Sequence, residues 1–582
     1  MAKEVKHKRR LDKEVKHEKM LDKEVKRRLC DYIVFPRTSL FILGLYFSRG
    51  LVDYAVTAVF IGYITSQWGS QNLPKAVSIV NLQAGVSSFM VIILARISDM
   101  WTGRFLMVVI TTPLYIIGLV LLCVEDARIT EEWVFYVAVL LTALGTAGLK
   151  MPLKEFVGDQ LRKRESVKPT TEVEPTEVKR INNVVQIWRG IPYFSGCILS
   201  MFTLSKNVSW AYKFKVSAIA IGVAYLLFWF GLPFYTDVTP PEKVDSPLTL
   251  LYDIPKAAIS KRHLDYPSDP TKFHRNDKEE LILSPPDRCL RWLDKAAILE
   301  STPQCPQEQF DQGKVFQVRQ VRAVKLLFRM VPMWTTFIFY SVVQTTGNTF
   351  FITQAAKLND KIGSNGLTLP TTVFFLVISF SNLIFGVLCD QLKKMIHDKE
   401  LQHRCTLVRI GFGMVTCILC CVTALQVEIR RLHTISMSIY WLIPQYCLLG
   451  VMKRLAEEGL KNFFNTQFGQ KTEYRIYEQV FTECALSIGK FVSIACVQIF
   501  QASFGDSINW SRFDHYYKML VFLCVGNLFY YICISMMYCN QSSPVEEEDL
   551  AAAFSEEDLV GKPGDQALGA TTEDPNLGEV PI

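Results

Sequence analysis

Long apolar blocks alternate with polar stretches along almost the whole chain. The blocks are about 20 residues or longer, which is the length that an α-helix needs to cross the hydrocarbon core of a bilayer. Because lipid offers the backbone no hydrogen-bond partner, such blocks must be helical. The predicted spans are residues 39–65, 73–97, 104–124, 132–158, 182–204, 213–235, 321–355, 368–390, 406–427, 437–466, 474–502 and 515–539. The pattern therefore predicts an all-α membrane protein with twelve transmembrane helices.

The polar stretches divide this chain into five parts. We expect a basic N-terminal tail with a decapeptide repeat, a six-helix bundle, a cytosolic linker, a second six-helix bundle and an acidic tail. Their bounds are residues 1–37, 38–235, 236–320, 321–540 and 541–582. The basic tail is either a solvated segment that keeps the N-terminus in the cytosol or a segment that attracts anionic lipid. The acidic tail is poor in aromatic residues and is expected to be disordered.

Lysine and arginine are concentrated in the loops after the fourth and eighth spans, in the N-terminal tail and in the linker. By the positive-inside rule, all of these lie in the cytosol, so both termini are expected there. Arg430 and Arg431 are an exception. Two groups of six helices joined by a cytosolic linker are typical of transporters with a binding site between two related halves. The membrane is expected to be the plasma membrane or the vacuolar membrane.

Composition changes this picture little. The formal net charge of +7 averages over segregated charges and indicates no nucleic-acid partner; the expected partners are the lipid bilayer and a small solute. Many of the 16 cysteines lie inside apolar blocks, where packing is the usual role. No Walker loop, HExxH or GxSxG stands out, so the sequence predicts no cofactor, no metal site and no enzyme.

A short loop between the second and third spans carries a recognisable spacing. Asp99, Gly103 and Arg104 resemble the D-x-x-x-G-R loop of the major facilitator superfamily. The glycine permits a tight turn, and the two charged side chains can contact neighbouring helix ends and latch one conformation. The alternative is an ordinary polar turn.

Further motifs resemble the plant nitrate transporter 1/peptide transporter family, which lies within the proton-coupled oligopeptide transporters of the major facilitator superfamily. They include Gly145-Thr-Ala-Gly-Leu-Lys150, Lys261-Arg-His-Leu-Asp-Tyr-Pro267, Arg409-Ile-Gly-Phe-Gly and Trp441-Leu-Ile-Pro-Gln-Tyr446, and the matches run in order from residue 38 to 535. The resemblance implies the twelve-helix fold of that superfamily. It also implies a solute drawn from nitrate, short peptides, hormones or specialised metabolites.

This sequence departs from the family pattern where the family binds its driving proton. The E-x-x-E-R motif usual in the first helix reads Tyr46-Phe-Ser-Arg49-Gly50, and the usual glutamate of the tenth helix is Lys453. Tyrosine and arginine titrate too far from neutral pH to replace the lost carboxylates. Tyr54 keeps the family's aromatic residue, and Gln344 keeps a polar residue in the seventh helix. The departures predict transport that is not coupled to protons.

Arg49, Lys150 and Lys453 would give the predicted cavity a basic wall. Cations within the membrane normally pair or line a wet path, and arginine's planar fork suits a planar oxyanion. Arg49 and Asp53 are four residues apart, as are Lys453 and Glu457, so each could instead form an intrahelical pair. Lys150 has no acid four residues away and is expected to be left for the solute. Asp53 is an alternative, displaced proton carrier.

Three functions remain open at this point. The favoured one is a secondary active or facilitative transporter that moves a small solute by alternating access. Nitrate or another anion is favoured, and a peptide or a specialised metabolite is the alternative. The second function is a transport-deficient sensor or scaffold that retains the transporter fold. The third, an integral membrane enzyme, would need a cluster of acidic, cysteine or histidine side chains that the sequence does not show.

Overall fold

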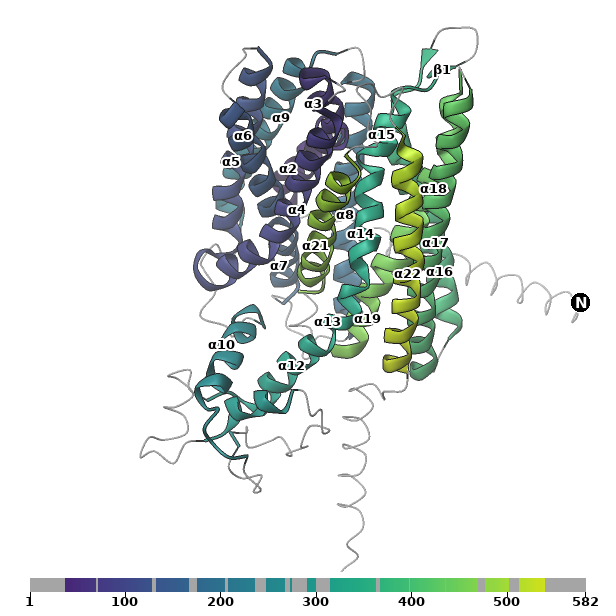
Figure 1. Cartoon of the computed structure of the whole chain (residues 1–582). Coiled ribbons are helices and arrows are strands. Elements are labelled where there is room, and N and C mark those ends of the chain that lie inside the picture. Colours follow the sequence, from purple (N-terminus) through teal and green to yellow (C-terminus); the bar gives the residue numbers. More distant parts are fainter. Residues whose placement is uncertain are drawn as a thin grey trace, which may run out of the picture.

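The computed structural model of this protein describes most of the chain between residues 37 and 539 (Figure 1). The described ranges are residues 37–69, 72–127, 132–166, 175–204, 208–235, 247–266, 273–274, 290–299, 315–362, 367–396, 398–434, 436–468, 477–501 and 512–539. The predicted acidic tail and all but the last residue of the predicted basic tail lie outside them.

The first part of the described chain is a group of helices that we call the N-terminal group. It comprises α2 (Arg37–Ala55), η1 (Thr57–Val59), α3 (Phe60–Trp68), α4 (Leu73–Ile97), η3 (Ser98–Thr102), α5 (Gly103–Ala127), α6 (Glu132–Lys150), α7 (Pro152–Ser166), α8 (Pro175–Thr203), α9 (Trp210–Phe230) and η4 (Leu232–Phe234). Within it, α2 packs against α8 and α9, and α5 packs against α6 and α9.

The last part is the C-terminal group. It comprises α12 (Val318–Arg329), α13 (Val331–Thr335), α14 (Phe337–Gly347), α15 (Phe350–Ala355), α16 (Val373–Met395), α17 (Lys399–His433), η7 (Ile439–Leu442), α18 (Ile443–Met452), η8 (Lys453–Glu457), α19 (Glu458–Phe468), α21 (Glu478–Ile499) and α22 (Phe513–Cys539). The two-residue strands β1 (Lys361–Ile362) and β2 (Leu367–Thr368) pair antiparallel and are the exception to an otherwise helical architecture in the described residues.

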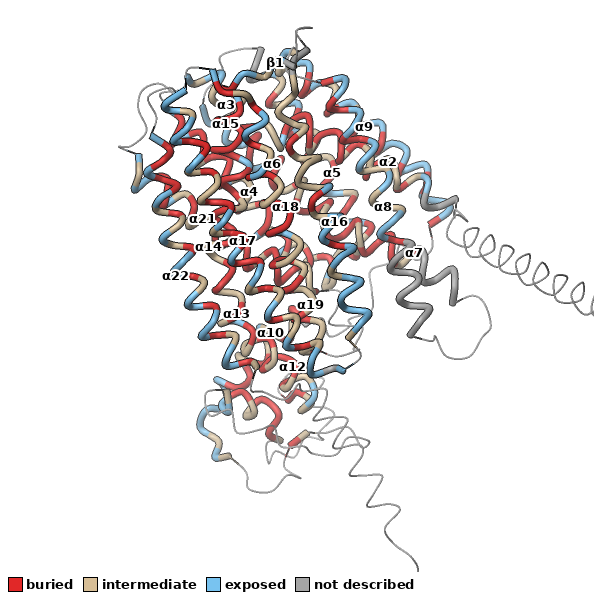
Figure 2. The backbone as a smooth tube through the Cα atoms, turned by 90° about the vertical axis from the view of Figure 1, so that its right-hand side faces the viewer, coloured by how far each residue is buried: buried red, intermediate tan, exposed pale blue. Residues whose placement is uncertain are grey.

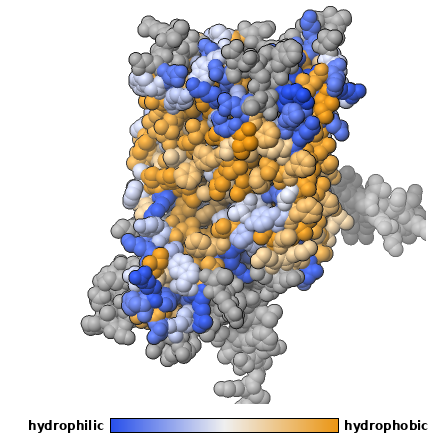
Figure 3. All heavy atoms as spheres, viewed as in Figure 1, coloured by the Kyte–Doolittle hydropathy of each residue, from blue (hydrophilic) through white to orange (hydrophobic). Residues whose placement is uncertain are grey.

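The described helices have the length and composition of membrane spans. Eight helical stretches are long and apolar enough to cross a bilayer, or nine when Val318–Thr335 and Phe337–Ala355, which meet at 54°, count as one span. One of the eight, Leu73–Val124, contains both α4 and α5. Figure 3 shows a band of hydrophobic residues across the face in view, with hydrophilic residues gathered above and below it. This surface is the one expected of a multi-pass membrane protein.

Several helices are interrupted at positions that their sequences explain. Gly103 has φ +71°, a backbone conformation that favours glycine, and it turns the chain between η3 and α5. At the break between α13 and α14, the carbonyl of Thr336 accepts a hydrogen bond from Asn527 Nδ2 at 2.8 Å. Lys453–Glu457 forms a single π-helical turn, a feature often found at functional sites.

The two groups meet along α4 and α21, which lie side by side (Figure 1). Asn81 Nδ2 donates to Ser493 Oγ at 2.9 Å, and Gln498 Nε2 donates to Ser78 Oγ at 3.1 Å. A Cβ at Gly85 would lie 2.8 Å from the ring of Phe491, so the glycine permits close packing here. This contact therefore fixes one side of the space between the groups.

The linker forms a small core of its own at one end of the molecule, which we call the linker end. α10 (Pro247–Ser260) and η6 (Arg291–Ala297) pack against the first turns of α12, and Figure 2 shows buried residues in this part of the chain. Lys325 Nζ lies 2.6 Å from Asp294 Oδ1, and both side chains are largely buried. Val321 and Val324 also belong to this core, so the helix predicted to begin the second bundle starts inside the linker.

Candidate functional site

Two adjoining cavities lie between the N-terminal and C-terminal groups. The larger, which we call the central cavity, has a volume of about 830 Å³, and the smaller, the cationic cavity, of about 610 Å³. They share the lining residues Lys150, Gln186, Tyr193, Asp390 and Arg454. The walls come from α2, α6 and α8 on one side and from α16 and the π-helical turn η8 on the other.

The structure brings together all six residues predicted to bind or couple the solute. Arg49 lines the cationic cavity. The other five line the central cavity: Asp53, Tyr54, Lys150, Gln344 and Lys453. Residues more than 400 positions apart in the sequence therefore face one space.

Arg49 and Asp53 form the intrahelical pair that their spacing allows. Arg49 Nε lies 3.6 Å from Asp53 Oδ2, and Arg49 Nη1 donates to the backbone carbonyl of Leu149 at 3.1 Å. Asp53 Oδ2 also accepts a hydrogen bond from the Tyr193 hydroxyl at 3.0 Å. The positive charge of Arg49 thus has a counterion in this state, and the role of Asp53 as a proton carrier stays a prediction.

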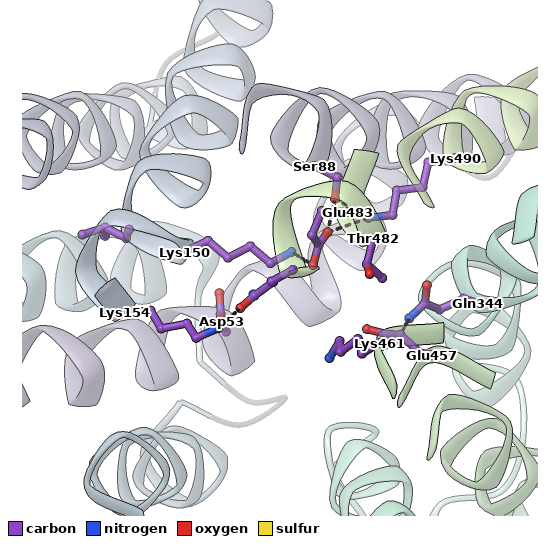
Figure 4. Close-up of polar contacts among 12 residues, drawn as sticks. Asp53, Ser88, Lys150, Lys154, Gln344, Glu457, Lys461, Thr482, Glu483 and Lys490 are labelled. Atoms are coloured by element: carbon purple, nitrogen blue, oxygen red, sulfur yellow. Dashed lines mark hydrogen bonds and ion pairs between the residues drawn. The ribbon is translucent and has the colours of Figure 1, made fainter. Parts of the chain in front are cut away.

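Lys150 has no acid four residues away on its own helix, but it pairs with an acid of another helix, and its role in binding the solute stays a prediction. Its Nζ lies 2.5 Å from Glu483 Oε1, which belongs to α21 of the other group (Figure 4). Glu483 Oε2 accepts from Ser88 Oγ at 2.8 Å, and Lys490 Nζ donates to the same hydroxyl at 2.5 Å. We call Ser88, Lys150, Glu483 and Lys490 the ion cluster. The spacing argument considered only acids on the helix of Lys150 itself.

Lys453 and Glu457 do not form the alternative intrahelical pair among the described contacts. Both residues lie in the π-helical turn η8, where positions four apart do not stack as they do in an α-helix. Glu457 is buried and accepts from Gln344 Nε2 at 3.5 Å, whereas Lys453 is exposed toward the central cavity. Lys453 is therefore available to a solute in a way that Glu457 is not.

The cationic cavity takes its name from seven lysine and arginine residues in its wall. Five of them lie near a carboxylate: Arg49 and Asp53 at 3.6 Å, Lys150 and Glu483 at 2.5 Å, Lys154 and Glu155 at 3.8 Å, Arg454 and Asp390 at 3.3 Å, and Lys461 and Glu458 at 2.7 Å. The other two are Arg189 and Arg409. The cavity is thus a polar, charge-dense space within an apolar shell.

The residues of the D-x-x-x-G-R loop make separate contacts at the linker end. Asp99 Oδ2 accepts a hydrogen bond from the Tyr477 hydroxyl at 2.5 Å, which joins the two groups. Arg104 forms an ion pair with Asp159 inside its own group. Lys154 Nζ adds a second contact between the groups by donating to Gln479 Oε1 at 2.9 Å. The loop thus takes part in a contact between the groups, and its role as a latch stays a prediction.

An apolar cluster packs between the groups at the end opposite the linker. Tyr54, Cys197 and Met201 are buried there against side chains of α16. The rings of Tyr54 and Phe375 meet edge to face, with centroids 5.9 Å apart. The two cavities, by contrast, extend to residues such as Lys461 and Glu478 near the linker end. The groups are thus in contact at both ends of the cavities, through this cluster at one end and through Tyr477 and Lys154 at the linker end.

The sequence analysis overlooked several of these residues, although most of them are charged residues inside apolar blocks. Glu483 and Lys490 are charged residues seven positions apart within the apolar block 474–502, so they share one helix face. Arg189 likewise lies inside the block 182–204. An ionisable residue inside a membrane span is a candidate functional residue by default. No group of three or more His, Cys, Asp or Glu residues in the described ranges could hold a metal ion.

Comparison with known proteins gives a consistent picture. The sequence model of the POT family, PTR2, matches residues 105–510. The protein NRT1/PTR FAMILY 5.6 of Arabidopsis thaliana is 27% identical over 538 residues, which cover 86% of this chain and 90% of that protein. NRT1/PTR FAMILY 5.7 of the same plant is 27% identical over 546 residues, covering 86% and 88%. The resemblance inferred from the motifs is thereby confirmed.

Solved structures show the same fold. The POT family transporter PepTSo superposes with a TM-score of 0.59 at 15% identity, covering 86% of this chain and 99% of its own. An auto-inhibited POT family peptide transporter gives a TM-score of 0.60 at 13% identity, covering 87% and 98%. A POT family transporter in complex with 5-aminolevulinic acid gives 0.58 at 12% identity, covering 87% and 97%. The matches give no support to the sensor or scaffold alternative.

Proposed function

Because the chain belongs to the POT family of membrane transporters, we propose that it moves a small anionic solute across the membrane by alternating access. The solute binds between the N-terminal and C-terminal groups, and the groups then rock so that the cavity opens on the other side. Nitrate and organic anions are the favoured solutes, with a peptide or a specialised metabolite as the alternative. The family is one of transporters and not of enzymes.

The architecture that we propose is two six-helix bundles of the major facilitator superfamily. Each predicted span has a helical counterpart in the described chain: α8 serves as the fifth span, the bent series α12–α15 as the seventh, and η7–α19 as the tenth. An even number of spans puts both termini on the same side of the membrane, and the basic loops favour the cytosol for that side. The plasma membrane or the vacuolar membrane is the membrane that we propose. The linker end is then the cytosolic end.

The observation that supports an anionic solute best is the ion cluster. Lys150 lies in the cavity wall, and its counterion Glu483 comes from the opposite group at 2.5 Å. An anion that enters the cavity competes with Glu483 for this lysine. Because the ion pair joins the two groups, exchanging its carboxylate for the solute weakens one contact between them. Binding and rocking are thereby linked through one lysine.

Transport is proposed to be independent of a proton gradient. The first helix presents Tyr46 and Arg49 where the family usually has carboxylates, and the carboxylate that remains near them, Asp53, is engaged by Arg49 and Tyr193. Glu483 is engaged by Lys150 and Ser88. Each of these two acids therefore has partners of its own in the described state.

A solute panel in oocytes that express the full chain tests this proposal. Nitrate, small organic acids, dipeptides and neutral analogues are offered at acidic and neutral external pH. We expect uptake of at least one anion, little change between the two pH values, and loss of uptake in Lys150→Met. Lys75→Met is the matched control, because Lys75 is an α4 lysine that pairs with Glu132 outside both cavities. Uptake that survives in Lys150→Met contradicts the role of the lysine, and strong acid stimulation contradicts the uncoupled mechanism.

A further inference from the structure

Two arginines in the cationic cavity differ from the other five cations of its wall. Arg189 on α8 and Arg409 on α17 have no carboxylate within ion-pair distance in the described part of the chain, whereas the others do. The wall also contains Glu458 and Glu478, but Glu458 pairs with Lys461 and Glu478 accepts from Asn465 Nδ2 at 2.7 Å. The available acids of this cavity are therefore already engaged.

The contacts that these two arginines make leave the Nε donor of each without a partner. The Nε atoms of Arg49 and Arg454 are also unsatisfied, but each of those two arginines has a carboxylate within ion-pair distance. The guanidinium of Arg189 lies over the ring of Tyr46, 5.7 Å from its centroid, and its Nε is buried without a hydrogen-bond partner. Arg409 donates from Nη2 to the backbone carbonyl of Arg454 at 2.6 Å, and its Nε is also buried and unsatisfied. A guanidinium offers five N–H donors in a fixed planar fork. A buried donor without a partner is costly, so such a fork indicates a ligand that supplies the missing acceptor.

We propose that Arg189 and Arg409 form an oxyanion clamp with one arm on each group of helices. The ligand chemistry that fits is a carboxylate, sulfate or phosphate, because these groups accept two parallel hydrogen bonds from one guanidinium. The arms lie on opposite sides of the cavity, so the cavity can close only when their charges are compensated. A bound oxyanion supplies that compensation and makes contact with both groups at once.

The adjoining central cavity indicates what the oxyanion is attached to. Its wall includes the aromatic residues Tyr54, Phe194 and Phe375 and the neutral polar residues Asn348, Ser379 and Asn382. A volume of about 830 Å³ is that of a pocket for a drug-sized molecule, far larger than a bare inorganic ion needs. The clamp therefore selects an organic oxyanion whose larger, partly aromatic body occupies the central cavity. This inference rests on the proposed function and narrows its solute from any anion to this class.

Binding of simple probes to the purified full-length protein tests the clamp. Phenylacetate and phenyl phosphate are expected to stabilise the protein against heat in a saturable manner, benzyl alcohol to have no effect, and nitrate to bind more weakly than either organic anion. Arg189→Gln and Arg409→Gln should each raise the apparent Kd of the organic anions about tenfold to a hundredfold, the range of a hydrogen bond to a charged group. Arg189→Lys and Arg409→Lys keep the charge without the fork and should lose less.

Arg404→Gln is the matched control, since Arg404 is an exposed arginine of the same helix α17 that pairs with Glu400. Its binding should equal that of the unmodified protein. The clamp is refuted if neither organic anion binds, if benzyl alcohol or nitrate binds as tightly as they do, or if the two glutamine variants retain full affinity. Uptake that depends on Lys150 while both glutamine variants bind normally would overturn the clamp alone. Clamp-dependent binding without uptake of any anion would overturn the proposed function alone.

Discussion

The ion cluster makes an asymmetric prediction about stability. Lys150 Nζ lies 2.5 Å from Glu483, and Lys490 Nζ lies 4.0 Å from the other carboxylate oxygen. The side chains of Lys150, Glu483 and Lys490 are only 23%, 11% and 14% exposed, so solvent screens them little. One carboxylate thus serves two ammonium groups. Removing the carboxylate should cost far more than removing either lysine.

Glu483→Gln is the informative perturbation, because it preserves the shape of the side chain and removes only its charge. It leaves two buried ammonium groups without a counterion, and removing one partner of a buried pair costs about 3–5 kcal/mol. Lys150→Met leaves Glu483 with Lys490 and with the Ser88 hydroxyl at 2.8 Å. The cost should then be about 1 kcal/mol, that of one net hydrogen bond. The two variants should therefore differ by at least about 2 kcal/mol.

Unfolding of the purified protein in detergent measures both free energies. Glu132→Gln is the control, because Glu132 is an exposed carboxylate paired with Lys75 at 3.7 Å, and its loss should change stability by less than about 0.5 kcal/mol. If Lys150→Met destabilises the protein as much as Glu483→Gln does, the shared-carboxylate argument is wrong. Lys150→Met should still abolish uptake, which separates its role in transport from its modest role in stability.

Three further predictions concern the linker end. Tyr477→Phe removes a hydrogen bond between the two groups. It should raise the labelling rate of a cysteine introduced into the cationic cavity about tenfold, because a hydrogen bond to a charged group contributes about that factor. An unchanged labelling rate would mean that this contact is no latch. Gly103→Ala forces φ +71° on a residue with a side chain and should cost about 1–2 kcal/mol in the unfolding assay, whereas Gly222→Ala, which meets nothing within 4 Å, should be neutral or stabilising. Asp294→Asn leaves Lys325 buried without its counterion. The rate at which protease cleaves the linker should rise several-fold, while the helix content measured by circular dichroism stays unchanged. Equal cleavage rates would contradict the pairing.

The positions of the helices were readable from the sequence because hydrocarbon imposes its own length on each apolar block. The predicted spans 73–97 and 515–539 coincide closely with α4 and α22. What hydropathy could not reveal is where a span breaks. At the bend between α13 and α14, the carbonyl of Thr336 accepts a hydrogen bond from Asn527 of the last helix, a contact that hydropathy does not indicate.

The residues of the candidate site could be predicted from the sequence, but their ion-pair and hydrogen-bond partners could not. Motif spacing pointed to Lys150 and Lys453 as cavity residues, and both line the central cavity. Their partners depend on contacts that no local rule describes. Glu483 lies 333 positions after Lys150, and the π-helical turn η8 separates Lys453 from the acid four residues ahead. Sequence periodicity assigns a residue to a face of its own helix, whereas pairing across the cavity is decided by how two groups of helices dock.

The linker core has a consequence for how far the molecule can move. α12 belongs to this core and leads directly into the C-terminal group, so the core travels with that group. It reaches the N-terminal group where the guanidinium of Arg96, at the end of α4, lies over the ring of Tyr252 on α10, 5.3 Å from its centroid. A cation over an aromatic face tolerates sliding better than a directional hydrogen bond does. The linker thus acts as a flexible tether, which permits small displacements at the linker end and limits how far the two groups can separate there.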